Sequence, residues 1–304
     1  MLLPNLIIAG APRCGTTSLF FYLSDHPEVC GANVKETYYF IDPGYPLFKP
    51  DRPNYENSGL NGYETYFEHC GDATRIWLDA TPDYLYQQSM LDAIEILPQS
   101  VRYLFLLRKP SERVWSCFTV AKNNMGVLSR DLSFRGFLDS VRASSTTSTC
   151  ELALVEKSEE QSRYITYLAR FAERLPRERM LLYLYEDLVD DPLRFITRVC
   201  TDIGISPGYY DDYHFQTLNR TIGIRNAALH RLVRKAERSL PERFQARLFW
   251  RDSWVKRLYR RFNAGTVGPR SIEDQRTINE LEQAFRPYNV ELARVFGLDV
   301  TAWE

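Results

Sequence analysis

The sequence lacks the features that mark several classes of protein. No stretch of its 304 residues approaches the eighteen or so consecutive apolar residues of a membrane-spanning helix. Its first residues, Met1 to Pro4, include neither a basic segment nor a long apolar run, so no secretory signal is expected. The net charge of −1 does not indicate a nucleic-acid binder. These absences predict a cytoplasmic protein with no transmembrane segment and no nucleic-acid partner.

Metal-binding spacing is also missing. The cysteines stand at positions 14, 30, 70, 117, 150 and 200, with no C-x-x-C pair and no Cys/His cluster along the chain. Structural zinc sites use such closely spaced ligands. We therefore expect no metal, and the simplest prediction is a chain whose cysteines are reduced.

The charge is unevenly distributed along the chain. Between residues 220 and 261 there are thirteen Lys and Arg against three acids, a local balance of +10, which leaves −11 for the rest. Apolar residues recur at helical spacing from 226 to 262, which predicts basic amphipathic helices. The basic side chains could contact an anionic surface, or they could simply be the solvated face of these helices.

Apolar runs of strand length alternate with helical patterns. The runs lie at 5–10, 74–79, 101–107 and 180–185, with a weaker one at 28–32. They are continuous rather than alternating, as in parallel strands that are buried on both faces. Helical patterns lie at 16–25, 87–97, 111–124, 131–143, 158–175 and 191–203. The order predicts a three-layer α/β fold, P-loop-like, with a central, mostly parallel sheet flanked by helices and a helical C-terminal region.

No repeat or linker divides the chain, which predicts one domain over 1–304. Its core would cover about 4–225, and the basic helical C-terminal region about 226–304. Residues 41–72 are rich in Pro, Gly, Tyr and Asn and predict a long surface excursion, a kind of loop that often carries function. SSTTSTC at 144–150 is typical of a flexible turn.

The first strand leads into GAPRCGTTS, residues 10–18, which nearly matches a nucleotide-binding P-loop. Glycine turns at the start of a helix bind phosphate through backbone N–H groups and the helix dipole. The P-loop pattern requires a lysine where this chain has Thr16, and the nearest cation is Arg13. Asp79 is the one candidate to hold magnesium. An NTP site is therefore disfavoured, whereas a single phosphoryl group could bind the loop and Arg13. Cys14 is expected to fill a tight turn rather than act as a nucleophile.

Two other strand ends carry polar residues. In YLFLLRKPSERVWSCF, a strand ends at Arg108, and Ser116 follows on the next helix, so the pair could clamp a second phosphate. Arg108 could instead form a surface salt bridge. Arg113 is expected to face solvent or an acidic neighbour. In KETYYF, Glu36 could be a general base with Lys35 orienting an anion; alone, such a pair is usually a solvated turn.

The residues of DATPDYLY at 79–86 leave a third strand at the same sheet edge. We expect Asp83 and Tyr84 to line an acceptor pocket.

Four segments together resemble the sulfotransferases that use 3′-phosphoadenosine 5′-phosphosulfate (PAPS), in particular the heparan sulfate glucosaminyl 3-O-sulfotransferases and their bacterial relatives. In order they are GAPRCGTTSL (10–19), HPEV with KETYYF (26–40), DATPDYLY (79–86) and LLRKPSERVWSCF (106–118). LYLYEDLVDDP at 182–192 is similar to a later strand and turn of the family. The resemblance covers about 4–225 and implies transfer of a sulfuryl group from PAPS to a hydroxyl, without a metal.

The resemblance also implies roles for individual residues. The 5′-phosphosulfate would bind the loop formed by Arg13, Cys14, Gly15, Thr16, Thr17 and Ser18. Arg108 and Ser116 would bind the 3′-phosphate, Glu36 would be the base beside Lys35, and Arg225 would close over the nucleotide. Many relatives have lysine at position 13; arginine is a poor proton donor, so Arg13 is expected to stabilise the leaving phosphate electrostatically.

The acceptor class is less sharply indicated. The resemblance favours a carbohydrate or glycolipid, while a small alcohol or phenol, a P-loop kinase, and a non-catalytic module that binds an anionic polymer or membrane surface are the alternatives.

Overall fold

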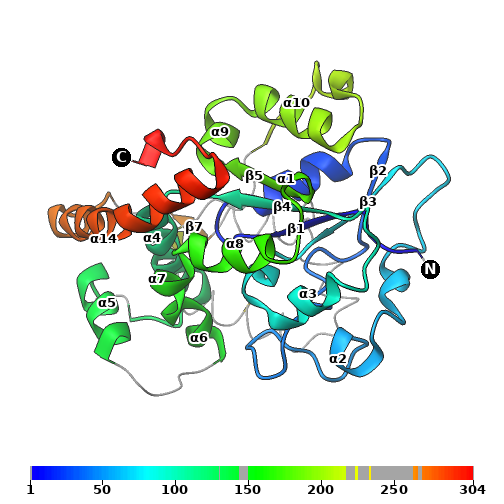
Figure 1. Ribbon diagram of the computed structural model, residues 1–304. Coiled ribbons are helices and arrows are strands. Elements are labelled where there is room, and N and C mark those ends of the chain that lie inside the picture. The colour runs from blue at the N-terminus through cyan, green and yellow to red at the C-terminus, as the bar shows by residue number, and fades with distance from the viewer. Residues whose placement is uncertain are drawn as a thin grey trace. The chain divides into compact units, whose positions relative to one another are not determined.

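The computed structural model describes residues 2–129, 131–143, 150–216, 223–224, 233, 263–265 and 269–303. Its centre is a parallel sheet of five strands in the order β2-β3-β1-β4-β5 (Figure 1). The strands are β1 (Leu6–Gly10), β2 (Val29–Gly31), β3 (Ile76–Ala80), β4 (Arg102–Leu107) and β5 (Met180–Leu184). Each lies within a residue or two of an apolar run in the sequence, which confirms the predicted sheet.

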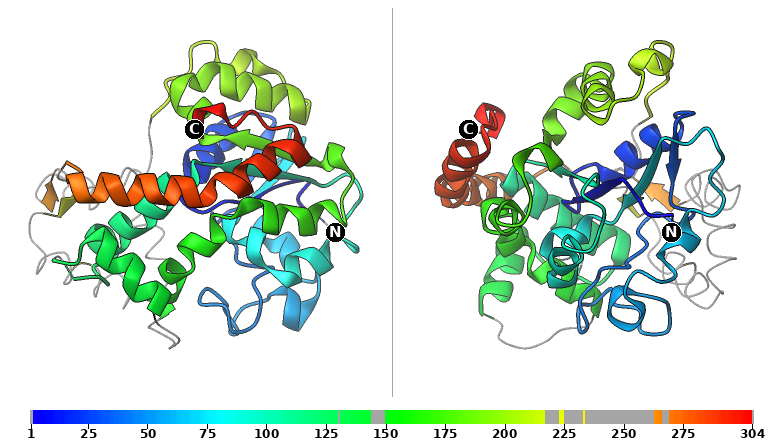
Figure 2. Two further views of the ribbon diagram at one scale, coloured as in Figure 1. Left: turned by 60° about the vertical axis from the view of Figure 1, so that its left-hand side comes forward. Right: turned by 45° about the vertical axis from the view of Figure 1, so that its right-hand side comes forward.

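Helices cover both faces of this sheet. Among those near the sheet, α1 (Thr16–Ser24) and α10 (Pro192–Ile203) lie on one side, and α3 (Gln88–Ala93) and α8 (Tyr164–Ala172) lie on the other (Figures 1 and 2). The five residues of β1 are fully shielded from solvent because they stand in the middle of the sheet with helices on both sides. The three-layer α/β prediction is confirmed.

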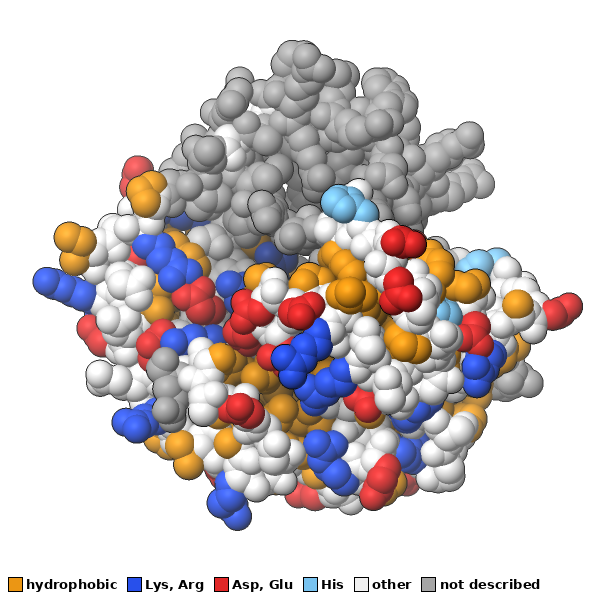
Figure 3. Space-filling view, turned by 90° about the horizontal axis from the view of Figure 1, so that it is seen from above, with side chains coloured by type: hydrophobic (Ala, Val, Ile, Leu, Met, Phe, Trp, Pro, Cys, Tyr) orange, Lys and Arg blue, Asp and Glu red, His pale blue; other side chains and the backbone are white. Residues whose placement is uncertain are grey.

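Shorter helices connect these elements. They are α2 (Tyr55–Ser58), α7 (Ser158–Gln161), α9 (Tyr185–Asp190), η1 (Tyr63–Tyr66), η2 (Pro82–Tyr86), η4 (Arg177–Arg179), η5 (Pro207–Tyr210) and η6 (Thr301–Trp303). On the face that carries α9 and α10, acidic, basic and hydrophobic side chains are interspersed among the described residues (Figure 3).

The chain divides into two compact units. The first comprises residues 1–114, 157–219 and 279–304, and it contains the sheet. The second comprises 115–156 and 220–278. It contains the π-helical turn η3 (Ala121–Met125), α5 (Phe134–Ala143), α6 (Cys150–Glu156) and a short antiparallel pair, β6 (Gly223–Ile224) with β7 (Ala264–Gly265). The single-domain assignment stays a prediction.

An aromatic cluster organises the described part of the second unit. The Trp115 and Phe134 rings meet edge to face at 5.1 Å, and Phe118 packs on Phe137 at 5.4 Å. The Arg270 guanidinium lies 5.2 Å from the centre of the Trp115 ring, within cation–π range.

Two long helices belong to both units. They are α4 (Pro110–Val120) and α14 (Ile272–Phe296). In the first unit, Glu282 of α14 pairs with Lys109, with 2.9 Å between Nζ and Oε1. The helical prediction for the C-terminal region is confirmed over α14, whereas Arg225 and the predicted basic helices lie outside the described residues, Val233 excepted. Residues 144–149 of the predicted turn lie outside them as well. None of the described helices is long and apolar enough to span a membrane.

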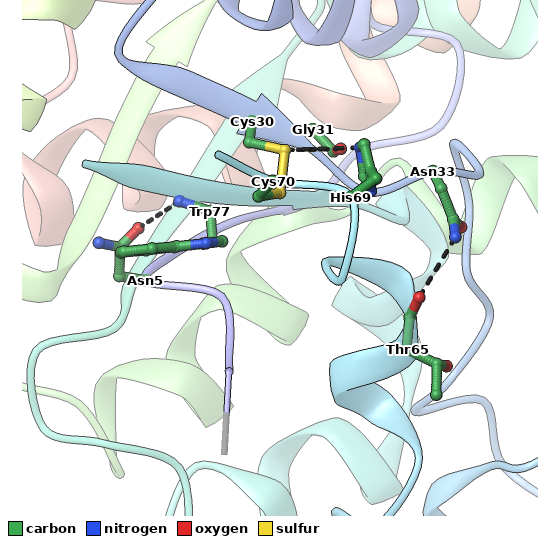
Figure 4. The surroundings of a disulfide bond; sticks show 8 residues. All are labelled: Asn5, Cys30, Gly31, Asn33, Thr65, His69, Cys70 and Trp77. Carbon is green, nitrogen blue, oxygen red and sulfur yellow. Dashed lines mark hydrogen bonds between the residues drawn. A yellow bond between two sulfur atoms is a disulfide. The ribbon is translucent and has the colours of Figure 1, made fainter. Parts of the chain in front are cut away.

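The segment between Cys30 and Cys70 differs from its prediction. Rather than forming a purely surface excursion, it buries Ile41, Tyr63 and Phe67 against the core. Cys30 and Cys70 form a disulfide, and the His69 ring stands beside the Cys30 sulfur (Figure 4). We call residues 31–69 the tyrosine segment, because they hold six of the 19 tyrosines.

The prediction of a fully reduced chain is therefore wrong. Spacing could not reveal the Cys30–Cys70 pair, because the residues are 40 positions apart and meet only through the tertiary fold. Disulfides persist mainly in oxidising compartments. The cysteines therefore no longer support the predicted cytoplasmic location. Cys30, Cys70 and His69 also converge as candidate metal ligands among the described residues. With the two sulfurs bonded to each other, neither is a thiolate ligand.

Candidate active site

The loop from Gly10 to Ser18 turns the end of β1 directly into α1. Gly15 is the N-cap of α1, with φ of 87°, a left-handed conformation that favours glycine. No side chain caps this end of the helix, and its first turn contains no acidic residue. The amides of Thr16, Thr17 and Ser18 stand where a helix has no acceptors of its own. This geometry suits an anion, as the sequence predicted.

Arg113 on α4 supports this loop from below. Its Nε donates to the Pro12 carbonyl at 2.9 Å, and its guanidinium also donates to the Ser158 carbonyl, the Ser162 hydroxyl and the Tyr86 hydroxyl, at 2.9–3.0 Å. Its exposed fraction is 1%. The expectation that Arg113 faces solvent or an acid is therefore wrong. Helical spacing placed it on α4, but only packing turned it into the core.

Cys14 is fully buried beneath the loop. Its sulfur lies 3.6 Å from the Tyr164 hydroxyl, which itself donates to the Arg108 carbonyl at 2.8 Å. Burial raises the pKa of the Cys14 thiol to about 11, although the Arg113 charge opposes the shift. A neutral, inaccessible thiol is not a nucleophile. The Cys14 side chain supports the loop through packing.

Arg108 follows β4 and is linked to the loop by Tyr185. Its guanidinium lies 4.9 Å from the centre of the Tyr185 ring and 3.5 Å from a Glu112 carboxylate oxygen. The same tyrosine ring faces Gly15 so closely that a Cβ there would come within 2.7 Å of a ring carbon. Tyr185 therefore sits between the anion loop and Arg108. Ser116 is buried on the part of α4 that belongs to the second unit, and its pairing with Arg108 stays a prediction.

Lys35 and Glu36 form an ion pair just after β2. The Glu36 side chain remains one-third exposed, and its other carboxylate oxygen accepts a 2.6 Å hydrogen bond from the Tyr38 hydroxyl. Burial by itself raises the pKa of Glu36, but the Lys35 charge and the hydrogen bonds from Lys35 and Tyr38 outweigh it, so the pKa lies below the ordinary 4.5. Glu36 is thus ionised at neutral pH, as a proton acceptor must be.

Arg13 belongs to the same electrostatic environment as Glu36. Its charge contributes to lowering the pKa of Glu36, although the two residues follow different strands. Among the described non-glycine residues, those with positive φ are Arg13 (69°), Glu36 (66°) and Tyr38 (56°). Such backbone conformations cost free energy and concentrate at functional sites. All three lie at one edge of the sheet, which marks this edge as the candidate active site.

Asp79 at the end of β3 fixes the chain beneath Glu36. It is fully buried and accepts hydrogen bonds from the Tyr63, Thr37, Tyr84 and Thr81 hydroxyls, at 2.6, 2.9, 3.0 and 3.1 Å. Burial raises its pKa above the ordinary 3.8. With four hydroxyl donors on a shielded carboxyl, Asp79 is not available to hold magnesium.

The predicted acceptor-pocket residues separate in the structure. Tyr84 is fully buried and its hydroxyl bonds Asp79, so it does not line a pocket and that part of the prediction is wrong. Asp83 is partly exposed and accepts a 2.8 Å hydrogen bond from the Tyr45 hydroxyl. Burial, together with the nearby negative charge of Glu36, raises the pKa of Asp83 to about 6.

The fold therefore brings the predicted loop, Lys35, Glu36 and Arg108 to one edge of the sheet. Sequence reasoning missed Arg113, Tyr38 and Tyr185. The position of Tyr38, two residues after the candidate base, was an available signal. No sequence signal indicated the roles of Arg113 and Tyr185, because the residues that each contacts lie far from it in the sequence.

Comparison with known proteins agrees with this site. Residues 4–211 match the model of the Sulfotransferase family, and the chain belongs to that family. A solved sulfotransferase from Alicyclobacillus acidocaldarius is 20% identical, with a TM-score of 0.65 over 100% of this chain and 99% of that one, which shows a common fold.

Three further relatives are longer proteins, of which this chain covers only a part. Human heparan sulfate glucosamine 3-O-sulfotransferase 3B1 is 22% identical over 98% of this chain and 64% of its own length. Human bifunctional heparan sulfate N-deacetylase/N-sulfotransferase 2 is 22% identical over 67% of this chain and 22% of its own length. Membrane-associated sulfotransferase kil1 of Dictyostelium discoideum is 29% identical over 36% of this chain and 21% of its own length. The chain thus spans a fifth to two thirds of the length of these relatives.

Proposed function

We propose that this protein transfers a sulfuryl group from PAPS to an acceptor hydroxyl, on a carbohydrate or glycolipid. The observation that carries the proposal is that the uncapped start of α1 after β1 and the Lys35–Glu36 pair after β2 lie at the same edge of one parallel sheet. A donor phosphate at the α1 amides and an acceptor at Glu36 would meet at this edge. The family match and the heparan sulfate relatives support sulfuryl transfer and a saccharide acceptor.

In the proposed reaction, the acceptor oxygen attacks sulfur while the Glu36 carboxylate takes the hydroxyl proton. The bond from sulfur to the 5′-phosphate oxygen breaks, and the phosphate leaves with the electron pair. Arg13 and the α1 amides stabilise its charge. When the donor binds, Lys35 would bond partly to the sulfuryl oxygens and less strongly to Glu36. Because the Lys35 charge lowers the pKa of Glu36, this weaker pairing would make Glu36 a stronger base.

Arg108, with Ser116, is proposed to bind the 3′-phosphate of the donor. Its separation from the anion loop by Tyr185 suits a nucleotide with one phosphate at the helix end and another on the ribose. Loss of Arg108 should weaken the binding of adenosine 3′,5′-bisphosphate far more than the binding of adenosine 5′-monophosphate. Equal losses of affinity for the two nucleotides would reject this role.

The test of the proposed reaction compares Glu36→Gln with the wild type. Without the base, turnover of labelled sulfate should fall about 10²–10⁴-fold. The variant should still bind adenosine 3′,5′-bisphosphate in isothermal titration, because the amide keeps the shape of the side chain. Near-normal turnover would show that Glu36 is not the base.

A P-loop kinase is the alternative, and the structure weighs against it. The loop has Thr16 at the lysine position, and Asp79 is held by four hydroxyls rather than open to a magnesium ion. Titration with ATP–Mg²⁺ and with adenosine 3′,5′-bisphosphate separates the two functions. Tighter binding of ATP–Mg²⁺ would favour the kinase.

A further inference from the structure

A pocket in the first unit has no role in the reaction just described. Its volume is about 380 Å³, and residues 42–46 of the tyrosine segment form one wall. Tyr86, Gln161 and Tyr167 are among the other residues that line it. A pocket of this size accommodates one or two sugar rings or a compound of similar bulk.

Hydrogen bonds connect this pocket to the candidate active site. The Tyr45 hydroxyl, on the pocket wall, donates to Asp83 at 2.8 Å and accepts from the Gln161 amide at 3.4 Å. Burial and the negative charge of Glu36 raise the pKa of Asp83. Tyr38, which donates to Glu36, lies within the electrostatic influence of both Asp83 and Tyr45. Tyr86, another lining residue, accepts a hydrogen bond from Arg113, which also donates to the Pro12 carbonyl of the anion loop. Hydrogen bonds therefore join the pocket both to Asp83 and to the arginine that supports the anion loop.

The charge of the pocket disfavours a polyanion. Lys157 is the one cation among the lining residues, against the carboxylates of Asp42 and Glu160. Asp42 is fixed in place, because its oxygens accept the Gln88 and Ser89 amides at the start of α3, at 2.8 and 2.6 Å. Behind the lining residues, the Asp83 carboxyl bonded to Tyr45 is offset by the Arg113 guanidinium bonded to Tyr86, so the lining residues decide the balance. A sulfated or uronate-rich chain would meet net negative charge here, and like charges brought together in a partly buried site repel.

The other lining residues suit an uncharged, hydroxyl-rich ring. Tyr45, Tyr86 and Tyr167 present aromatic surface, with the Tyr86 and Tyr167 rings edge to face at 4.8 Å. Pro43 and Pro46 add rigid apolar contacts. Carboxylate and amide oxygens among them can accept hydrogen bonds from hydroxyls. Apolar walls with a few fixed polar groups are typical of a site that orients a small ligand.

We propose that this pocket holds the acceptor and selects an uncharged sugar rather than an anionic polysaccharide. The inference rests on the proposed sulfuryl transfer and names its substrate class. It also distinguishes this chain from its heparan sulfate relatives, which are named for an anionic polymer.

The experiment measures binding and transfer separately on the full chain, with adenosine 3′,5′-bisphosphate bound for the titrations. The probes are methyl β-lactoside, an uncharged disaccharide, and a heparin hexasaccharide. We expect the lactoside to bind at least tenfold more tightly than the hexasaccharide. Tyr167→Ala should lower the affinity for the lactoside about tenfold and leave bisphosphate binding unchanged. Glu160 is exposed, and Glu160→Lys replaces a negative charge at the pocket by a positive one. It should reduce the ratio of lactoside affinity to hexasaccharide affinity by a similar factor.

Glu173→Lys is the matched control, because Glu173 is an exposed glutamate at the end of α8 that does not line the pocket. It should leave both affinities unchanged. Tighter binding of the hexasaccharide, no binding of the lactoside, or lactoside binding that neither pocket variant alters would overturn the inference.

Labelled-sulfate assays distinguish this failure from failure of the proposed function. Transfer to the hexasaccharide in preference to the lactoside rejects the uncharged-sugar inference and leaves sulfuryl transfer intact. Binding of the lactoside in the pocket, with no transfer to saccharides, alcohols or phenols, rejects sulfuryl transfer itself.

Discussion

The anion loop of residues 10–18 and the tyrosine segment of residues 31–69 build the two sides of the candidate site in different ways. The loop offers backbone amides and a helix end, held from beneath by a single buried arginine. The tyrosine segment relies on side-chain hydroxyls and is closed by a disulfide at its ends. Backbone groups bind any suitable phosphate, whereas side chains can change with the acceptor. If the reaction proceeds as proposed, the donor side is the general half of the site and the acceptor side is the specific half.

The largest effect is expected from Arg113→Met, which breaks the support of the anion loop. It leaves several buried acceptors unpaired, so the free energy of unfolding should fall by about 3–5 kcal/mol. Binding of adenosine 3′,5′-bisphosphate should weaken as well, because the Pro12 carbonyl loses its anchor. Urea denaturation and isothermal titration measure the two effects.

Arg102→Met is the control for that change. Arg102 donates to the Asp202 and Ile203 carbonyls near the end of α10, away from the loop. It should lower stability without changing bisphosphate affinity. Equal losses of affinity in both variants would mean that Arg113 acts on stability alone.

The next largest effect should come from replacing Cys30 and Cys70 together by serine. Their disulfide closes a loop of 40 residues, and its loss should cost about 2–4 kcal/mol of unfolding free energy. The acceptor KM should rise while bisphosphate affinity stays within about twofold, because only the tyrosine segment is released. Reduced wild type should behave in the same way. A matching loss of bisphosphate affinity would show that the two sides are not independent.

Gly15→Ala sharpens the donor half of the comparison. Alanine there combines a left-handed backbone with a 2.7 Å approach to Tyr185, at a cost of about 1–3 kcal/mol. Bisphosphate should bind about tenfold more weakly, as measured by titration. Gly204→Ala is the matched control, since φ is +78° there but nothing lies within 4 Å of the added Cβ. If both variants bind bisphosphate normally, the loop geometry does not determine donor affinity.

The smallest effect concerns pH and the acceptor half. The pKa of Asp83 is about 6 in the folded protein against an ordinary 3.8, so between these values the folded state binds more protons than the unfolded chain. The free energy of unfolding contributed by this group therefore falls as pH rises from about 4 to 6. In Asp83→Asn that decline should disappear. Two pKa units correspond to about 3 kcal/mol, and because the Asp83 carboxyl is partly exposed, we expect solvent screening to reduce the measured difference from wild type to about 1 kcal/mol across the range.

Urea midpoints at pH 4 to 7 measure this decline. In Tyr45→Phe it should extend to higher pH, because the Tyr45 hydroxyl stabilises the ionised carboxylate. Identical pH profiles for wild type and Asp83→Asn would contradict the raised pKa.

Much of the fold could be predicted from the sequence, for a local reason. The runs at 5–10 and 101–107 are continuous and apolar because both faces of these strands are covered, and they became β1 and β4. Gly15 and the residues after it predicted a helix start, which has no side-chain cap in the structure, a geometry that suits an anion. The Lys35–Glu36 pair was visible as well, since its members are adjacent in the chain.

Other features of the site depended on contacts between distant residues. The face that Arg113 presents depends on which elements pack around α4, and its partners Pro12 and Ser158 lie far from it in sequence. Tyr84 looked as suitable for an acceptor pocket as Asp83, yet packing placed one beneath the site and left the other at its edge.

The sequence by itself determined the sulfotransferase-type elements, the anion loop and the candidate base, because hydrophobic periodicity and glycine turns act over a few neighbouring residues. Only the tertiary structure decided that Cys30 meets Cys70, that Arg113 holds the loop, and that a tyrosine-lined, net negative pocket contacts Asp83 through Tyr45. Each of these features forms between residues that are far apart in the sequence and are brought together in the folded core. Burial there removes water, so polar and charged groups must find partners within the protein.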